Sequence, residues 1–84
     1  MYSIELSQTS IKFLKKLNEK DSDIILNKIY FLRDNPFRFL KKLQGQKLWR
    51  LRIGDYRAVI DVIIKNNEIF VVKIGKRSNI YQTE

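Results

Sequence analysis

The fold of this chain is decided by residues 48–60, which read LWRLRIGDYRAVI. Apolar and polar residues alternate along the first half of this stretch, as in a strand with one buried face. The residues on its apolar face are Trp49, Leu51 and Ile53. Gly54 and Asp55 then interrupt the alternation, and glycine at the first position of a two-residue loop is typical of a tight hairpin. Residues 56–65 continue as the second strand, so the stretch predicts an antiparallel β-hairpin.

The register of this hairpin gathers positive charge on one face. With residues 54–55 as the loop, Arg52 lies opposite Arg57 in the ladder. Arg50 lies two residues earlier on the same face, opposite Val59. Three arginines are therefore expected on the side of the sheet away from the apolar residues.

A second hairpin is expected to turn at residues 66–68. A two-residue loop at 66–67 would place Lys73 in the core, which is costly. A three-residue loop with an asparagine in the left-handed conformation avoids that cost. The pairs expected inside are Ile64 with Phe70, Val62 with Val72, and Ile60 with Ile74. The pairs expected outside are Asp61 with Lys73 and Arg57 with Arg77.

Two amphipathic helices precede the hairpins. Residues 7–18 have an apolar stripe at helical spacing, and Ser7 is a suitable N-cap. A second helix is expected to begin at Asp21 or Ser22 and to stop at the Asn35-Pro36 pair. The stripe residues are Ile11, Leu14 and Leu17 in the first helix, and Ile25, Ile29 and Leu32 in the second. A short turn between them predicts a helical hairpin covering one face of the sheet.

The predicted architecture is a single α+β domain over residues 1–84, because a chain this short builds only one core. Its N-terminal strand, residues 2–6, and the two-helix hairpin pack on a small, mostly antiparallel β-sheet. Residues 37–46 show no clear period. Their apolar members are Phe37, Phe39, Leu40 and Leu43. We interpret these four side chains as closing the edge of the core, and the alternative is that they form an aromatic platform for nucleic acid.

Positive charge is concentrated in the second half of the chain, and the formal net charge is +8. Residues 1–36 contain six Lys or Arg residues against five acidic residues, whereas residues 37–84 contain eleven against four. This asymmetry favours a polyanionic partner, and nucleic acid rather than membrane because no strongly amphipathic basic helix is present. The alternative is a charge that serves solubility alone.

Composition excludes several kinds of site. The chain has no cysteine and no histidine, which removes disulfides, thiolate zinc sites and any catalytic triad that needs an imidazole. Asp55, Asp61 and Glu68 are too dispersed for a two-metal cage. We therefore expect no metal and no cofactor.

The hydropathy pattern predicts a cytoplasmic protein without a membrane segment. Its longest apolar runs, residues 58–60 and 62–64, are far shorter than the roughly 20 residues of a membrane span. Residues 1–6 alternate polar and apolar positions rather than forming the apolar block of a signal peptide.

The choice of arginine on the strands indicates phosphate binding. Lysine is the commoner cation in the chain, yet four of the six arginines fall in predicted strands: Arg50, Arg52, Arg57 and Arg77. Arginine presents a planar fork of donors that matches phosphate geometry. Like charges opposite one another destabilise a sheet, whereas a bound polyanion relieves the repulsion. The alternative is that these side chains splay into solvent or pair with Asp34, Asp55 or the C-terminus.

Such a face suits RNA cleavage. Attack by a ribose 2′-OH needs a base, a proton donor for the leaving oxygen and cations around the phosphorane, with no obligatory metal. Arginine supplies the cations. Tyr81 follows four residues after Arg77, and its phenol can stack on a base or transfer a proton. Its alternative role is packing or simple surface exposure.

With residues 48–60, VKIGKR at residues 72–77 and Tyr81, the sequence closely resembles the RelE/ParE superfamily of bacterial and archaeal toxins. The resemblance spans nearly the whole chain and implies a RelE-like fold related to microbial ribonucleases. For the RelE branch it implies cleavage of mRNA in the ribosomal A site, which leaves a 2′,3′-cyclic phosphate and a 5′-hydroxyl. It also implies a RelB-like antitoxin as the neutralising partner.

The resemblance assigns roles to individual residues. Tyr81 would be the base, Arg77 would assist the leaving group, and three arginines would hold the phosphate: Arg50, Arg52 and Arg57. Many relatives have histidine where Lys76 stands, and others use a histidine and a glutamate as proton carriers. Three lysines are expected to add RNA-binding charge: Lys47, Lys73 and Lys76.

The preferred function is thus a metal-independent, ribosome-dependent mRNA endoribonuclease that acts as the toxin of a type II toxin–antitoxin system. One alternative is a ParE-like toxin that poisons DNA gyrase without cutting RNA. Another is a non-catalytic RNA-binding member of the family.

Overall fold

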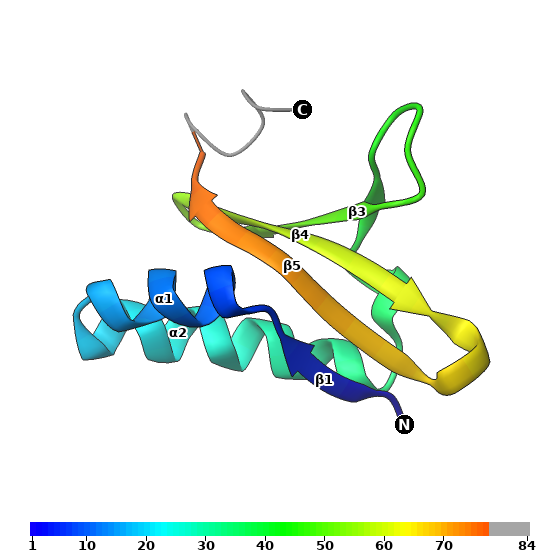
Figure 1. The fold of residues 1–84 in the computed structure, drawn as a ribbon, viewed down its shortest axis with the longest axis horizontal. Coiled ribbons are helices and arrows are strands. Elements are labelled where there is room, and N and C mark those ends of the chain that lie inside the picture. The colour runs from blue at the N-terminus through cyan, green and yellow to red at the C-terminus, as the bar shows by residue number, and fades with distance from the viewer. Residues whose placement is uncertain (78–84) are drawn as a thin grey trace.

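The structure is a computed structural model that describes residues 1–77. Its strands form one mixed sheet in the order β1-β5-β4-β3-β2. β1 (Ser3–Leu6) runs parallel to β5 (Glu68–Lys76), and the other neighbours are antiparallel: β2 (Lys41–Lys42), β3 (Trp49–Ile53) and β4 (Tyr56–Ile63). Helices α1 (Gln8–Lys16) and α2 (Glu19–Tyr30) lie together on one side of the strands (Figure 1). The predicted α+β architecture, with a two-helix hairpin on one face of a mostly antiparallel sheet, is confirmed.

The β3–β4 hairpin has the predicted register. Arg52 lies opposite Arg57, and Arg50 lies opposite Val59. Gly54 begins the turn with φ of +57°, in the left-handed region that glycine enters without steric cost. The local sequence therefore specifies both the turn and the pairing.

The β4–β5 hairpin differs from the prediction in register. A short 3₁₀ turn, Ile64–Asn66, leads into Asn67. Asn67 has φ of 50° and ψ of 48°, so the expected left-handed asparagine is present. The pairs along the ladder are Val62 with Ile69, Asp61 with Phe70, Ile60 with Val71, Val59 with Lys73, Ala58 with Ile74, and Arg57 with Gly75. The predicted partners of Ile60, Asp61, Val62 and Arg57 were therefore wrong. Ile64, which was expected opposite Phe70, lies in the turn instead.

A β-bulge explains the error. Ile60 pairs with Val71 while the preceding Val59 pairs with Lys73, which leaves Val72 as an extra residue on β5. The bulge reverses the alternation, so Ile69 and Val71 before it and Ile74 after it are all buried. The sequence prediction assumed strict alternation, which placed Phe70 and Val72 in the core instead.

Serines at the start of α1 hold this bulge. Ser7 is the predicted N-cap, and its Oγ accepts a hydrogen bond from the Ser10 backbone N–H at 3.0 Å. The Ser7 hydroxyl also donates to the Val72 carbonyl at 2.7 Å, and the buried Ser10 hydroxyl donates to the Val71 carbonyl at 3.1 Å. The helix thus satisfies carbonyl groups at the irregular point of the neighbouring strand.

Helix α2 begins earlier than predicted. Its N-cap is Asn18, whose Oδ1 accepts from the Asp21 backbone N–H at 2.8 Å, rather than Asp21 or Ser22. Asp21 therefore lies in the first turn, where a carboxylate interacts favourably with the helix dipole. The helix ends at Tyr30, and two 3₁₀ turns, Phe31–Arg33 and Pro36–Arg38, lead to β2.

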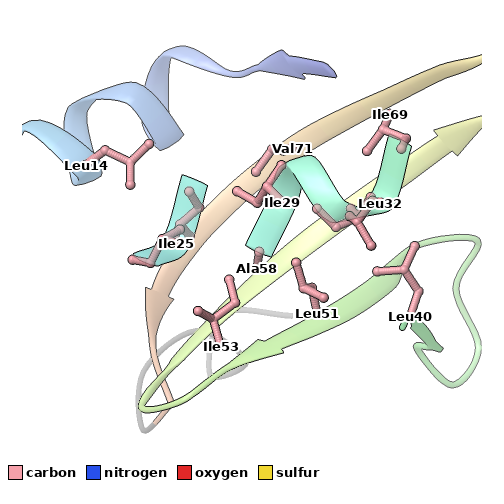
Figure 2. Close-up of a cluster of buried hydrophobic side chains, with 12 residues drawn as sticks. Leu14, Ile25, Ile29, Leu32, Leu40, Leu51, Ile53, Ala58, Ile69 and Val71 are labelled. Atoms are coloured by element: carbon pink, nitrogen blue, oxygen red, sulfur yellow. The ribbon is translucent and has the colours of Figure 1, made fainter. Parts of the chain in front are cut away.

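The core lies between the helices and the sheet (Figure 2). Helices α1 and α2 contribute Leu14, Ile25 and Ile29, and the 3₁₀ turn after α2 contributes Leu32. The strands contribute Leu51, Ile53, Ala58, Ile60, Ile69, Val71 and Ile74. Leu40 closes one edge, as predicted, whereas Phe37 and Phe39 remain exposed. In the described part of the chain, no helix has the length and apolarity needed to cross a membrane.

Candidate RNA-binding site

The sheet face opposite the helices carries the predicted arginines. Leu51 and Ile53 of β3 point into the core, so the alternate residues Arg50 and Arg52 point to the other side. Arg57 of β4 lies opposite Arg52 in the ladder and shares that side. We call this side of the sheet the arginine face.

A cavity of about 420 Å³ opens on the arginine face. The structure brings together in its wall all four arginines predicted for the site, together with Lys41, which the sequence did not indicate, and Phe39, which the sequence indicated only as part of an alternative. We call it the arginine cavity; its lining residues are Phe39, Lys41, Arg50, Arg52, Arg57 and Arg77. No aspartate or glutamate of residues 1–77 lines it.

Arg57 is the most constrained of these cations. Its side chain is only 6% exposed, and its Nη1 donates hydrogen bonds of 2.8 Å to the carbonyl oxygens of Gly54 and Tyr56. The guanidinium is thus fixed by the turn of the hairpin that carries it. A buried cation held by carbonyl dipoles alone still lacks an ionic partner, which favours an anion beside it.

Arg50 and Arg52 are exposed, and Arg77 is exposed just beyond the end of β5. The backbone N–H of Arg77 donates to the Asp55 carbonyl at 2.9 Å, which extends the β4–β5 ladder by one bond. Within residues 1–77, none of the four arginines forms an ion pair with a carboxylate. The alternative in which they pair with Asp34 or Asp55 is therefore wrong for the described residues.

Acidic residues near the arginine face lie in neighbouring cavities. Asp61 was expected opposite Lys73, where it would relieve the arginine repulsion, but its partner in the ladder is Phe70. Asp61 instead lines a cavity of about 310 Å³ with Lys47 and Trp49. Among residues 1–77, therefore, no carboxylate in the wall offsets the positive charge of the arginine cavity.

The three predicted RNA-binding lysines are dispersed. Lys47 lines the cavity that contains Asp61, and Lys76 lines a cavity of about 480 Å³ together with Arg77. Lys73 lies on the arginine face opposite Val59 but does not line the arginine cavity. Lys41, which the sequence did not indicate, contributes the additional positive charge of the arginine cavity. It lies there because the short strand β2 pairs it with Arg50.

Two tyrosines, Tyr81 and Tyr56, are considered as the base that accepts a proton. Tyr81, the predicted base, lies outside the described residues. Tyr56, beside the turn, donates its hydroxyl to Asp21 Oδ2 at 2.9 Å. This hydrogen bond, followed by burial and by the negative charges of Asp21 and Asp55, raises the pKa of Tyr56 above its usual value. Tyr56 therefore stays protonated at neutral pH and is unsuited to act as a base.

Within the described range, no three His, Cys, Asp or Glu side chains gather where they could hold a metal ion. The arginine face presents four guanidinium groups around one cavity. It can bind a phosphate group and stabilise added negative charge on it.

Solved structures of toxin–antitoxin complexes share this fold. The archaeal RelE–RelB complex from Pyrococcus horikoshii OT3 contains a chain 27% identical to this one, with a TM-score of 0.80 over 93% of this chain and 97% of that chain. The intact RelBE complex of E. coli matches at 25% identity and a TM-score of 0.76, over 90% and 96% of the two chains. RelBE2 from Mycobacterium tuberculosis matches in fold, with a TM-score of 0.83 at 19% identity over 90% and 98%.

No curated protein sequence matches the chain. The sequence model of the family described as ParE toxin of type II toxin–antitoxin system, parDE, matches residues 4–81 and so covers almost the entire chain. The chain therefore belongs to the ParE toxin family, within the RelE/ParE superfamily of type II toxins.

Proposed function

We propose that this toxin is a ribosome-dependent endoribonuclease that cleaves mRNA in the ribosomal A site, in the cytoplasm. The observation that carries the proposal is the arginine cavity, where four guanidinium groups converge without a carboxylate from residues 1–77 in its wall. Concentrated positive charge of this kind favours a phosphodiester over a neutral or cationic substrate.

The proposed reaction is an internal transfer at phosphorus. The 2′-oxygen of one ribose attacks the adjacent phosphorus and loses its proton to a base, while the 5′-oxygen of the next nucleotide leaves and gains a proton. The products are a 2′,3′-cyclic phosphate and a 5′-hydroxyl. Negative charge accumulates on the non-bridging oxygens in the transition state, where fixed guanidinium donors are most effective.

The arginines differ in how firmly the protein holds them, and we assign their roles accordingly. Arg57, held by two carbonyl groups, provides a fixed donor close to the sheet. Arg50 and Arg52 are exposed and can close on the phosphate from β3. By resemblance to RelE toxins, Arg77 assists the leaving 5′-oxygen and Tyr81 accepts the proton of the 2′-OH.

The ribosome supplies what the isolated toxin lacks. Arginine remains protonated and cannot take the 2′-OH proton, and the chain has no histidine for that task. When the ribosome holds the mRNA with the 2′-oxygen in line with the leaving oxygen, much of the entropic barrier to cleavage is removed. Cleavage is therefore expected only on translated message.

Primer extension on translated mRNA tests the proposal. Wild-type toxin should produce cuts within codons in a translating lysate, and Arg77→Ala combined with Tyr81→Phe should abolish them. Lys12→Ala, which removes a charge from the exposed side of α1, should leave cleavage intact. Uncut message with folded wild-type protein, or full cleavage by the double variant, would contradict the proposal.

Inhibition of DNA gyrase is the second candidate, because the matching family is described by its ParE member. A gyrase poison would block supercoiling of plasmid DNA and leave translated message intact. The two assays on the same protein preparation therefore separate the two functions.

A RelB-like antitoxin is the proposed partner, in line with the RelE–RelB complexes among the structural neighbours. An acidic segment of the antitoxin would bind the arginine face and exclude RNA. Co-purification of a small acidic protein encoded beside the toxin, with loss of cleavage in the complex, is the expected result. A toxin that purifies alone and is not inhibited by that neighbour would refute the pairing.

A further inference from the structure

Phe39 is the only aromatic side chain of the described residues in the wall of the arginine cavity. It is 42% exposed, although phenylalanine is an apolar residue that cores usually bury. Single exposed apolar residues are common on protein surfaces. The unusual feature of Phe39 is therefore its position among phosphate-binding cations, and not its exposure.

The backbone around Phe39 is anchored on both sides. Pro36 and Leu40 are buried, and the Phe39 backbone N–H donates to the Pro36 carbonyl at 3.3 Å, closing a 3₁₀ turn. The ring therefore projects from a fixed support. A ligand that stacks on it loses little ordering entropy in the protein, which is the condition for a preorganised site.

Two cations lie near the Phe39 ring. The Arg38 guanidinium carbon is 5.5 Å from the ring centroid, and Lys28 Nζ is 5.8 Å from it. These contacts restrain the ring and add positive charge around it. An aromatic ring surrounded by cations is the combination by which proteins hold single-stranded RNA, since bases stack while phosphates are neutralised.

Phe37 provides the contrast. It is 41% exposed and lies two residues earlier, but its ring is 5.0 Å from the Trp49 ring and it lines the cavity that contains Asp61. Phe37 thus already has an aromatic partner within the protein. Phe39 has no aromatic partner within residues 1–77.

We propose that Phe39 is a stacking platform for the nucleobase adjacent to the phosphate held in the arginine cavity. The proposal rests on the RNA-cleaving function above and adds a base-binding position to it. Stacking on a phenyl ring accepts any base and binds purines best because their surface is larger. Phe39 would therefore set how firmly the substrate is held, with a preference for a purine beside the scissile bond.

Binding of short RNA to the isolated toxin provides the test. The probes are fluorescent RNA pentanucleotides with 2′-O-methyl groups on every sugar, which prevent cleavage, and a set of the same oligonucleotides in which one base at a time is removed. Fluorescence anisotropy at low salt gives the dissociation constants. Phe39→Ala and Phe39→Leu should weaken binding of the intact oligonucleotide at least about five-fold, since a stacked base contributes on that scale. Phe39→Trp should bind at least as well as wild type, and Phe37→Ala should bind like wild type.

The oligonucleotides that lack one base locate the contact. Removal of the stacked base should weaken wild type and leave Phe39→Ala unaffected, so that the two proteins bind this probe equally. If Phe39→Leu retains full affinity, or if the Phe39→Ala loss persists with every probe, the platform is overturned while cleavage of translated message still stands. If wild type fails to bind any probe and leaves translated message uncut, both the platform and the proposed function fail.

Discussion

The two faces of the sheet are built from alternate residues of the same strands, and they serve different ends. On the helix side, Leu51 and Ile60 are 1% and 0% exposed and pack into a continuous core. On the arginine face, Arg52 lies directly opposite Arg57, an arrangement that costs the sheet stability. The helix side thus stabilises the fold, whereas the arginine face retains a repulsion that a bound anion would relieve.

Loss of two cavity arginines should separate activity from stability most strongly. Arg50→Gln combined with Arg52→Gln is expected to reduce mRNA cleavage by about a thousand-fold, since single transition-state donors contribute about 10²–10³. The thermal unfolding temperature should stay the same or rise, because repulsion with Arg57 is removed. Lys15→Gln combined with Lys16→Gln removes the same charge from α1 and should keep cleavage near wild type. A double arginine variant that loses cleavage only because it unfolds would contradict the division between the faces.

Truncation of a core side chain on the helix side should instead lower the stability of the fold. Leu51→Ala is expected to lower the free energy of unfolding by about 3 kcal/mol, because it leaves a cavity at a fully buried position. Urea denaturation measures this loss. Leu48→Ala, at a half-buried position just before β3, should cost clearly less. Equal losses at both positions would show that burial in the core does not govern stability here.

The turn between β3 and β4 belongs to neither face, and substitution of Gly54 should act through the backbone alone. A Cβ added at Gly54 meets no atom within 4 Å, so Gly54→Ala suffers only from the φ of +57°. That strain is expected to cost about 1 kcal/mol. Gly54→Asn should cost less, since asparagine tolerates this region and Asn67 already adopts it. Chemical denaturation compares the two variants, and a larger loss for asparagine would refute the explanation.

The smallest effect concerns the hydrogen bond between Tyr56 and Asp21. The pKa of Tyr56 is raised, so the phenol contributes stability below its unfolded pKa of about 10 and loses that contribution as pH rises through the folded pKa. In Asp21→Asn the pKa should fall back toward the ordinary value. Ultraviolet titration of tyrosinate, with Tyr56→Phe subtracted, follows this group. Asp23→Asn, an exposed neighbour on α2, should leave the titration unchanged, and an unchanged titration in Asp21→Asn would contradict the assignment.

Local signals explain which hairpin could be predicted from sequence. Gly54 fixes the first turn, and the alternation of arginine with apolar residues fixes its register. In the second hairpin every residue from 69 to 72 is apolar, so alternation cannot tell Phe70 from Ile69 as the buried residue. The bulge at Val72 depends on hydroxyl groups of Ser7 and Ser10, which come from a distant part of the chain.

The candidate site, like the hairpins, was predictable from sequence only where it lies on regular strands. Arg50, Arg52 and Arg57 were grouped correctly because the regular β3–β4 ladder places them. Arg77 was grouped with them through a register that was wrong, and Lys41 and Phe39 come from a segment without periodicity. Only the pairing of the two-residue strand β2 with β3 places Lys41 beside Arg50. The start of α2 was misplaced because Asn18, Asp21 and Ser22 are all good caps, and local sequence does not rank them.

The extra residue at Val72 also decides which way the end of β5 faces. Counting from the buried Ile69 and Val71, an uninterrupted strand would turn residues 73, 75 and 77 toward the helices. With the bulge, Ile74 turns inward and Arg77 emerges among the other arginines. The fourth guanidinium of the arginine cavity therefore owes its place to a one-residue irregularity within β5, at Val72.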